Sequence, residues 1–159
     1  MPKELFTPTT NAGEKSPSNS FDNLFDVESY GNDGSKLTYW ISEKTETDDF
    51  KPQITIDFKE AVLLEAFHLF PAYSSNGNLR NFLGFPNKVI VKTSLDNGPL
   101  VDNTIFVGTP TTSDWNMIQY ALTNPVNCTK LVIKMQEVSL LSGEKRLQFG
   151  GLLLFRSFD

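Results

Sequence analysis

Several short segments of this chain alternate apolar and polar residues with a period of two. That period is the pattern of a β-strand that buries one face. In the segment QITIDF, Ile54, Ile56 and Phe58 alternate with polar residues, and the same alternation recurs in 87–94 (NKVIVKTS) and 130–136 (KLVIKMQ). Strands of this kind are stable only when their apolar faces are buried, so the pattern favours sheets that enclose a core on one face.

Further strand candidates lie between turn signals. They are 61–70 (AVLLEAFHLF), 117–122 (MIQYAL), 147–155 (LQFGGLLLF) and a weaker one at 104–107. The intervening motifs SSNGN, LDNG and TNP carry the Gly, Pro and Asn residues typical of loops. No long helix and no internal repeat is evident. The sequence therefore predicts an all-β fold, an antiparallel β-sandwich or barrel.

The chain has 159 residues, which fits one domain of ordinary size. Residues 1–20 are rich in Pro, Ser, Thr, Asn and Gly, a composition that favours a flexible leader or linker before a domain at 21–159. A linker would place the domain in a longer, modular protein. An ordinary frayed terminus is the alternative.

Charge and cysteine content exclude several classes of partner and site. The net charge is −5 with scattered Lys and Arg, which argues against nucleic-acid binding and against anionic membranes. No apolar run is long enough to span a bilayer. A single cysteine, Cys128, leaves no internal disulfide and no cysteine-ligated zinc site.

The segment NDGSKLTYW combines a turn, several oxygen-bearing groups and Trp40. Calcium takes carboxylate, hydroxyl and carbonyl oxygens at flexible geometry, so such a loop is a candidate site for a hard cation. An ordinary loop with Trp40 as its anchor in the core is the alternative.

The order of motifs along the chain resembles the discoidin, or coagulation-factor type C, family of the galactose-binding-like superfamily. The motifs that carry the resemblance are DGSKLTYW, ITIDF, EAFHLFP, KVIVKTSLDNG, NPVNCTKLVIKM and FGGLLLF. The family's Asp-Gly turn leading to Thr-x-Trp is matched by Asp33, Gly34, Thr38 and Trp40. The resemblance implies a jelly-roll-like sandwich whose end loops carry the binding surface.

The same resemblance implies a structural calcium held by the Asp33 carboxylate and the Thr38 hydroxyl. A glutamate near the last strand commonly completes that shell in the family, and Gly151 stands at the nearest position here. The departure removes a charged ligand, and calcium affinity depends on the number of charged ligands.

Sugar-binding members of the family use aromatic faces and forked polar groups on loops, which points to the loop Pro71–Pro86. Planar guanidinium and amide groups can bond two adjacent hydroxyls at once. The expected contacts are Tyr73, Asn78, Arg80, Asn81 and Phe82. In the alternative, Phe82 and Phe85 fold back over the sandwich and Arg80 is solvated.

His68, the only histidine, is out of phase with Phe67 and Leu69, so it is expected on the other sheet face or toward a loop, where it is a candidate sugar contact. A catalytic pair with Cys128 lacks a supporting motif, because free cysteines are usually small buried hydrophobes. The acidic residues Glu46, Asp48 and Asp49 are expected on a solvated surface.

Three function classes follow. The first is a noncatalytic carbohydrate-binding module that recognises a glycan, appended to other domains of a secreted or cell-surface protein as the resemblance implies. The second is a discoidin-type protein- or phospholipid-binding adhesion domain. The third is an enzyme, for which the sequence offers only isolated carboxylates. The first class fits the loop residues best.

Overall fold

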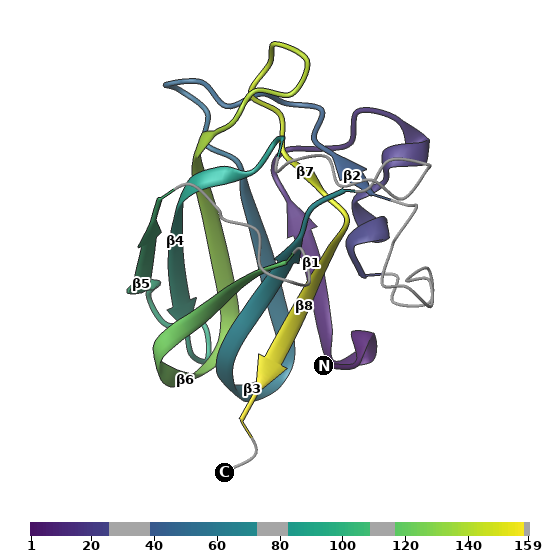
Figure 1. The fold of residues 1–159 in the computed structure, drawn as a ribbon. Coiled ribbons are helices and arrows are strands. Elements are labelled where there is room, and N and C mark those ends of the chain that lie inside the picture. The colour runs from purple at the N-terminus through teal and green to yellow at the C-terminus, as the bar shows by residue number, and fades with distance from the viewer. Residues whose placement is uncertain (26–38, 73–82, 109–116, 158–159) are drawn as a thin grey trace.

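The computed structural model describes residues 1–25, 39–72, 83–108 and 117–157 (Figure 1). Its strands are β1 (Phe6–Thr10), β2 (Trp40–Ile41), β3 (Gln53–Phe70), β4 (Pro86–Ser94), β5 (Val101–Val107), β6 (Ile118–Val138), β7 (Gln148–Phe149) and β8 (Gly151–Arg156). Three short 3₁₀ helices are η1 (Lys3–Leu5), η2 (Pro17–Asn19) and η3 (Phe21–Phe25). No helix in these ranges is long and apolar enough to cross a membrane.

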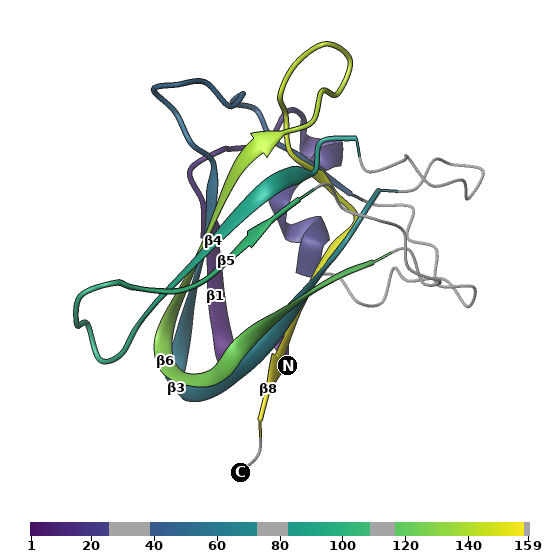
Figure 2. The ribbon, with the colours of Figure 1, turned by 60° about the vertical axis from the view of Figure 1, so that its left-hand side comes forward.

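The two long strands β3 and β6 run through both layers of the sandwich. They pair antiparallel with each other, and the strand order is β1-β3-β6-β4-β5, with β8 also paired to β3. The first half of β3 pairs with β1 and its second half with β8. Figures 1 and 2 show β3 and β6 turning back together at one end of the molecule, which is called the bend end below.

A register jump between β3 and β6 accounts for the bend. Asp57 pairs with Lys130 and Val62 with Cys128, so residues 58–61 of β3 lie opposite Thr129 alone. Extra residues in one strand of a pair bend that strand and increase its twist. One continuous sheet therefore folds over to make both layers. The strands expected separately at 53–58 and 61–70 are a single strand, and so are those expected at 117–122 and 130–136.

The core lies between the two layers. Ile54 and Ile56 from the first half of β3 are fully buried, as are Phe67 and Leu69 from its second half. They belong to one continuous apolar cluster with residues of β4, β6 and β8. The all-β class and the antiparallel sandwich predicted from the alternation are confirmed.

Residues 6–10 are part of the sheet, which corrects the expectation of a flexible leader at 1–20. β1 pairs with β3 from Phe6 opposite Phe58 to Thr10 opposite Ile54. Phe6 and Ala12 are buried in the core cluster. Composition misleads here because an edge strand is held mainly by backbone hydrogen bonds, which polar residues form as well as apolar ones.

Trp40 is the anchor of the segment NDGSKLTYW. Its indole Nε1 donates a hydrogen bond to the carbonyl oxygen of Gly13 at 2.8 Å, and its ring lies edge-on to Phe21 with centroids 5.2 Å apart. The side chain is fully buried. The core-anchor interpretation of Trp40 is therefore confirmed, whereas Asp33 and Thr38 lie outside the described residues.

Replacing Phe6 by Ala tests whether the first strand is structural. We expect the free energy of unfolding to fall by about 3 kcal/mol, because the change removes a buried aromatic ring and leaves a cavity. Denaturant unfolding measures it. Thr9→Ala, at an exposed position on the same strand, is the control, with an expected change below about 0.5 kcal/mol. Equal and negligible changes in both variants would mean that β1 does not contribute to stability.

Candidate ligand-binding end of the sandwich

The end of the sandwich opposite the bend gathers several strand termini. Leu69 pairs with Ile118 and Phe70 with Gly151, so β3 ends where β6 and β8 begin. The sequence resemblance predicts that the binding loops lie at one end of the sandwich. We call this end of the sandwich, together with the described residues next to it, the loop end.

An aromatic cluster closes the core beneath the loop end. The ring of Phe149 lies 6.0 Å from that of Trp40 and 4.9 Å from that of Phe85, the latter at 83°. Edge-to-face contacts of this kind stabilise beyond the area they bury. Phe85 is only 1% exposed. For Phe85 the alternative interpretation is therefore confirmed: its ring folds back over the sandwich and offers no face to a ligand.

The loop Pro71–Pro86 is tied to the β7–β8 segment at its two limbs, at Phe70, the residue that precedes it, and at Gly84, near its end. The Gly150 N–H donates to the carbonyl oxygen of Phe70 at 2.7 Å, and the Gln148 N–H donates to the carbonyl oxygen of Gly84 at 3.1 Å. Gly84 has a φ of +75°, and a Cβ there would lie 2.6 Å from the carbonyl oxygen of Arg146. Only glycine satisfies both conditions, so the segment passes β7 on its way to β4 through an obligatory glycine.

Most of the predicted contacts lie outside the described residues. These are the sugar-contact candidates Tyr73, Asn78, Arg80, Asn81 and Phe82 and the cation-ligand candidates Asp33 and Thr38. Their roles stay predictions. Ala72 and Leu83 are the described residues on either side of the 73–82 segment. They lie close in the chain to Phe70 and Gly84, the two positions hydrogen-bonded at the loop end.

His68 is the one predicted contact among the described residues, and it lies on the outer face of the second layer. It pairs with Gln119 of β6 and Leu153 of β8, while its neighbours Phe67 and Leu69 are fully buried on the inner face. Its ring lies 4.2 Å from that of Phe155. Burial lowers the pKa of His68 below its ordinary value, so the imidazole is neutral at pH 7. His68 therefore faces away from the core, as its phase in the sequence predicts.

Gln148 is a buried polar residue that the sequence reasoning missed. Its side chain is 1% exposed, and neither amide atom has a hydrogen-bond partner within the described part of the chain. Buried polar groups are normally paired, so an orphaned amide at the loop end is unusual. The available signal was a single Gln inside the apolar run LQFGGLLLF.

Gly151 tests the fit of the expected calcium shell. It begins β8 and carries no side-chain oxygen, so it offers no charged ligand where the family commonly has a glutamate. The described residues contain no group of three His, Cys, Asp or Glu side chains placed to hold a metal ion. The described position nearest to the family's glutamate therefore supplies no charged ligand to the expected shell.

The catalytic alternatives do not assemble among the described residues. Cys128 is fully buried in the core cluster, on the face opposite His68, and burial raises the pKa of its thiol to about 11. A thiol with that pKa carries almost no thiolate at neutral pH, and the thiolate is the nucleophile. Cys128 and His68 therefore cannot form a catalytic pair.

Glu46 is buried, which corrects the expectation that it belongs to a solvated acidic surface. Its carboxylate accepts hydrogen bonds from the backbone N–H groups of Glu137 and Val138 at 2.8 and 2.7 Å, and it lies 3.4 Å from the ammonium of Lys51. It thus ties the 42–52 loop to the end of β6. Asp48 and Asp49 are exposed, as expected.

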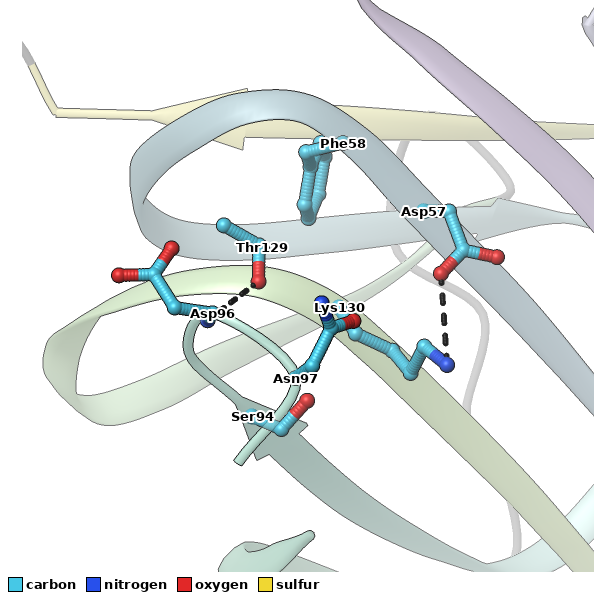
Figure 3. Close-up of a pocket in the computed structure, with 7 residues that line it drawn as sticks. All are labelled: Asp57, Phe58, Ser94, Asp96, Asn97, Thr129 and Lys130. Carbon is cyan, nitrogen blue, oxygen red and sulfur yellow. Dashed lines mark hydrogen bonds and ion pairs between the residues drawn. The ribbon is translucent and has the colours of Figure 1, made fainter. Parts of the chain in front are cut away.

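A polar hollow of about 240 Å³ at the bend end is already engaged in structural bonds (Figure 3). Lys130 forms an ion pair with Asp57 at 3.5 Å, and the Asp96 N–H donates to Thr129 Oγ1 at 2.9 Å. Asp96 and Asn97 have φ values of 51° and 61°, the positive values of a tight hairpin turn. The Asp96 bond fixes the β4–β5 turn on β6 and the ion pair joins β6 to β3, so we assign the hollow a structural role.

Replacing Gln148 by Met tests whether its amide is truly unpaired. We expect the free energy of unfolding to rise by about 1–2 kcal/mol, because the change removes a buried donor and acceptor at nearly constant volume. Denaturant unfolding measures it, with the half-buried Gln136→Met as the control. A loss of stability in Gln148→Met alone would show that the amide has a partner, such as a bound water.

No protein-family model matches the sequence, and no curated protein matches it closely enough to count as a relative. Solved structures do match. The CBM32-1 and CBM32-2 domains of Clostridium perfringens ZmpB in complex with GalNAc match with a TM-score of 0.73 at 15% identity, over 100% of this chain and 36% of that chain. CBM32-3 from a family 31 glycoside hydrolase of Clostridium perfringens matches with a TM-score of 0.69 at 15% identity, over 97% and 92%.

The family 32 carbohydrate-binding module of Clostridium perfringens NanJ in complex with galactose matches with a TM-score of 0.66 at 12% identity, over 96% of this chain and 95% of that chain. This chain spans about a third of the ZmpB structure and nearly all of the two single modules. At identities this low, the similarity shows only that the fold is shared. The chain has the β-sandwich fold of these family 32 carbohydrate-binding modules.

Proposed function

We propose that this chain is a noncatalytic carbohydrate-binding module that recognises a galactose-type sugar at its loop end. One observation carries the proposal: the fold matches, over nearly the whole chain, modules solved in complex with GalNAc and galactose. Fold alone does not fix function, because function depends on the site built on the fold. The residues of the Pro71–Pro86 loop supply the second support.

The loop residues have the chemistry that a sugar requires. Arg80, Asn81 and Asn78 are forked or amide groups for adjacent hydroxyls, while Tyr73 and Phe82 are aromatic faces for the apolar side of the ring. Both limbs of the loop are hydrogen-bonded to the β7–β8 segment. A loop that is held at both ends loses less conformational entropy when it binds a ligand. This supports sugar recognition by the Pro71–Pro86 loop.

The host protein of such a module would be secreted or displayed at the cell surface, where glycans are available. The ZmpB and glycoside hydrolase modules are parts of longer chains, and we propose the same for this one. Single shallow sugar sites bind weakly, so attachment to other domains would raise the effective affinity. The net charge of −5 gives no support for a nucleic-acid or anionic-membrane partner.

Replacing Arg80 by Ala tests the proposed site. On a glycan array and by calorimetry with galactose and GalNAc, we expect the wild-type chain to bind and the variant to lose at least about tenfold in affinity, because a bidentate group is removed. The control is Lys59→Ala, an exposed position at the bend end that also loses one positive charge.

Two results would contradict the proposal. Silence of the wild-type chain across the array would favour a protein partner, as in discoidin-type adhesion domains. Release of reducing sugar from a bound oligosaccharide would show an enzyme. Unfolding curves of Arg80→Ala identical to those of the wild type are needed to read the loss of binding as a loss of contact.

We further propose a weak calcium site that uses Asp33 and Thr38. With Gly151 in place of an acidic ligand, Asp33 is the one carboxylate among the residues assigned to the shell. Calcium affinity falls with the number of charged ligands, so the dissociation constant belongs in the range of about 10⁻⁴–10⁻³ M typical of extracellular modules.

Thermal unfolding in calcium tests the weak site. A site with a dissociation constant near 1 mM would gain about 1.4 kcal/mol at 10 mM calcium, which raises the Tm by roughly 3–6 °C for a chain of this size. We expect that rise at 10 mM, none at 10 µM, and none in Asp33→Asn. A rise already at 10 µM would mean a tight site, and no rise at 10 mM would mean none.

A further inference from the structure

A groove lies on the outer face of the second layer. The strands β6, β3 and β8 run side by side there (Figure 1). Two rows of cross-strand partners form its floor and one side. Ala66 pairs with Ala121 of β6 and with Phe155 of β8, and His68 pairs with Gln119 and Leu153. Because directly opposite residues project to the same face, the two alanines leave a low floor beside the rings of Phe155 and His68.

A β-bulge turns Glu65 toward this groove. The register jumps between Leu64 and Ala66 in the ladders to both β6 and β8, so Glu65 has no partner in either. Leu64 and Phe67 are both fully buried, although they are three positions apart, and strict alternation would have placed them on opposite faces. The bulge therefore puts Glu65 and Ala66 together on the outer face, which is how a bulge redirects a side chain.

An excursion of β6 forms the opposite wall. Leu64 pairs with Val126 and Ala66 with Ala121, so residues 122–125 of β6 leave the ladder at this point. Leu122 and Pro125 of the excursion line the groove, which encloses about 400 Å³. That volume falls in the range of roughly 300–1,000 Å³ found for small-molecule sites.

The groove carries hydrogen-bonding groups that the described structure does not use. Neither Glu65 nor Gln119 makes a side-chain hydrogen bond or ion pair among the described residues, and the described contact of the His68 side chain is with the ring of Phe155. The imidazole of His68, neutral because burial lowers its pKa, has one donor and one acceptor. Phe155 is 38% exposed, so part of its ring is open to a ligand.

We propose that this groove is a second carbohydrate site, distinct from the loop end, that takes one sugar ring against Phe155. Glu65 and Gln119 would bond its hydroxyls and His68 would bond one more. That the ligand is a sugar rests on the proposed function. That a ligand binds here rests on the shape of the groove and on the residues that line it. The Glu65 carboxylate disfavours an anionic ligand, and the narrow alanine floor between polar groups does not suit an extended apolar partner.

Residue-resolved NMR titration of the full chain with galactose and with GalNAc tests this site. The chain is compared with Arg80→Ala, which removes a proposed loop-end contact, and with Phe155→Leu and Glu65→Gln, which alter the groove. Glu60→Gln, an exposed carboxylate on the same strand at the bend, is the matched control. We expect saturable shifts at 65–68, Gln119 and Phe155 that persist in Arg80→Ala and Glu60→Gln. In Glu65→Gln and Phe155→Leu we expect the dissociation constant for these shifts to rise at least fivefold.

The outcomes separate the second site from the proposed function. Shifts confined to the loop end would overturn the groove site and leave the proposed function standing. Shifts in the groove without any at the loop end would support the groove site and contradict the loop-end assignment. Absence of shifts with either sugar would overturn both. Phe155→Leu keeps an apolar side chain, and Glu65→Gln changes an exposed group, so both variants are expected to fold.

Discussion

The pairing of β3 with β6 is the interaction on which the rest of the structure depends. These strands of 18 and 21 residues are the longest, and together they form the centre of both layers. Two irregularities in this one ladder determine the molecule's shape. The insertion at 58–61 folds the sheet over on itself, and the bulge at Glu65 with the excursion at 122–125 hollows its outer face. Bending and groove formation thus have the same physical origin, extra residues that the ladder cannot pair.

The loop end depends on a different constraint, close backbone packing around β7. Gly84 must be glycine because of its positive φ and its approach to Arg146, and Trp40, Phe85 and Phe149 fill the space beneath. Aromatic packing and backbone hydrogen bonds hold both limbs of the Pro71–Pro86 loop. A loop held by a rigid scaffold is the arrangement on which binding sites are commonly built.

The sequence predicted the local structure well and the long-range register poorly. Alternation at Ile54, Ile56 and Phe58 identified a strand and its buried face, because side-chain phase is a local property. The continuity of β3, the pairing of β1 and the burial of Glu46 escaped prediction, since each depends on a partner far along the chain. Glu46 accepts bonds from residues about ninety positions away, and no local charge pattern contains that information.

The same distinction explains how far a binding site can be predicted. Residue types in Pro71–Pro86 suggest a sugar loop because they are contiguous, whereas Glu65, Gln119 and Phe155 come together only through the register of three strands. The outward orientation of His68 is the one feature of the groove that the sequence indicated. A module with one site at its end and another on its face would engage two branches of a glycan at once. Where each site binds weakly, such bivalency raises affinity without any deeper pocket.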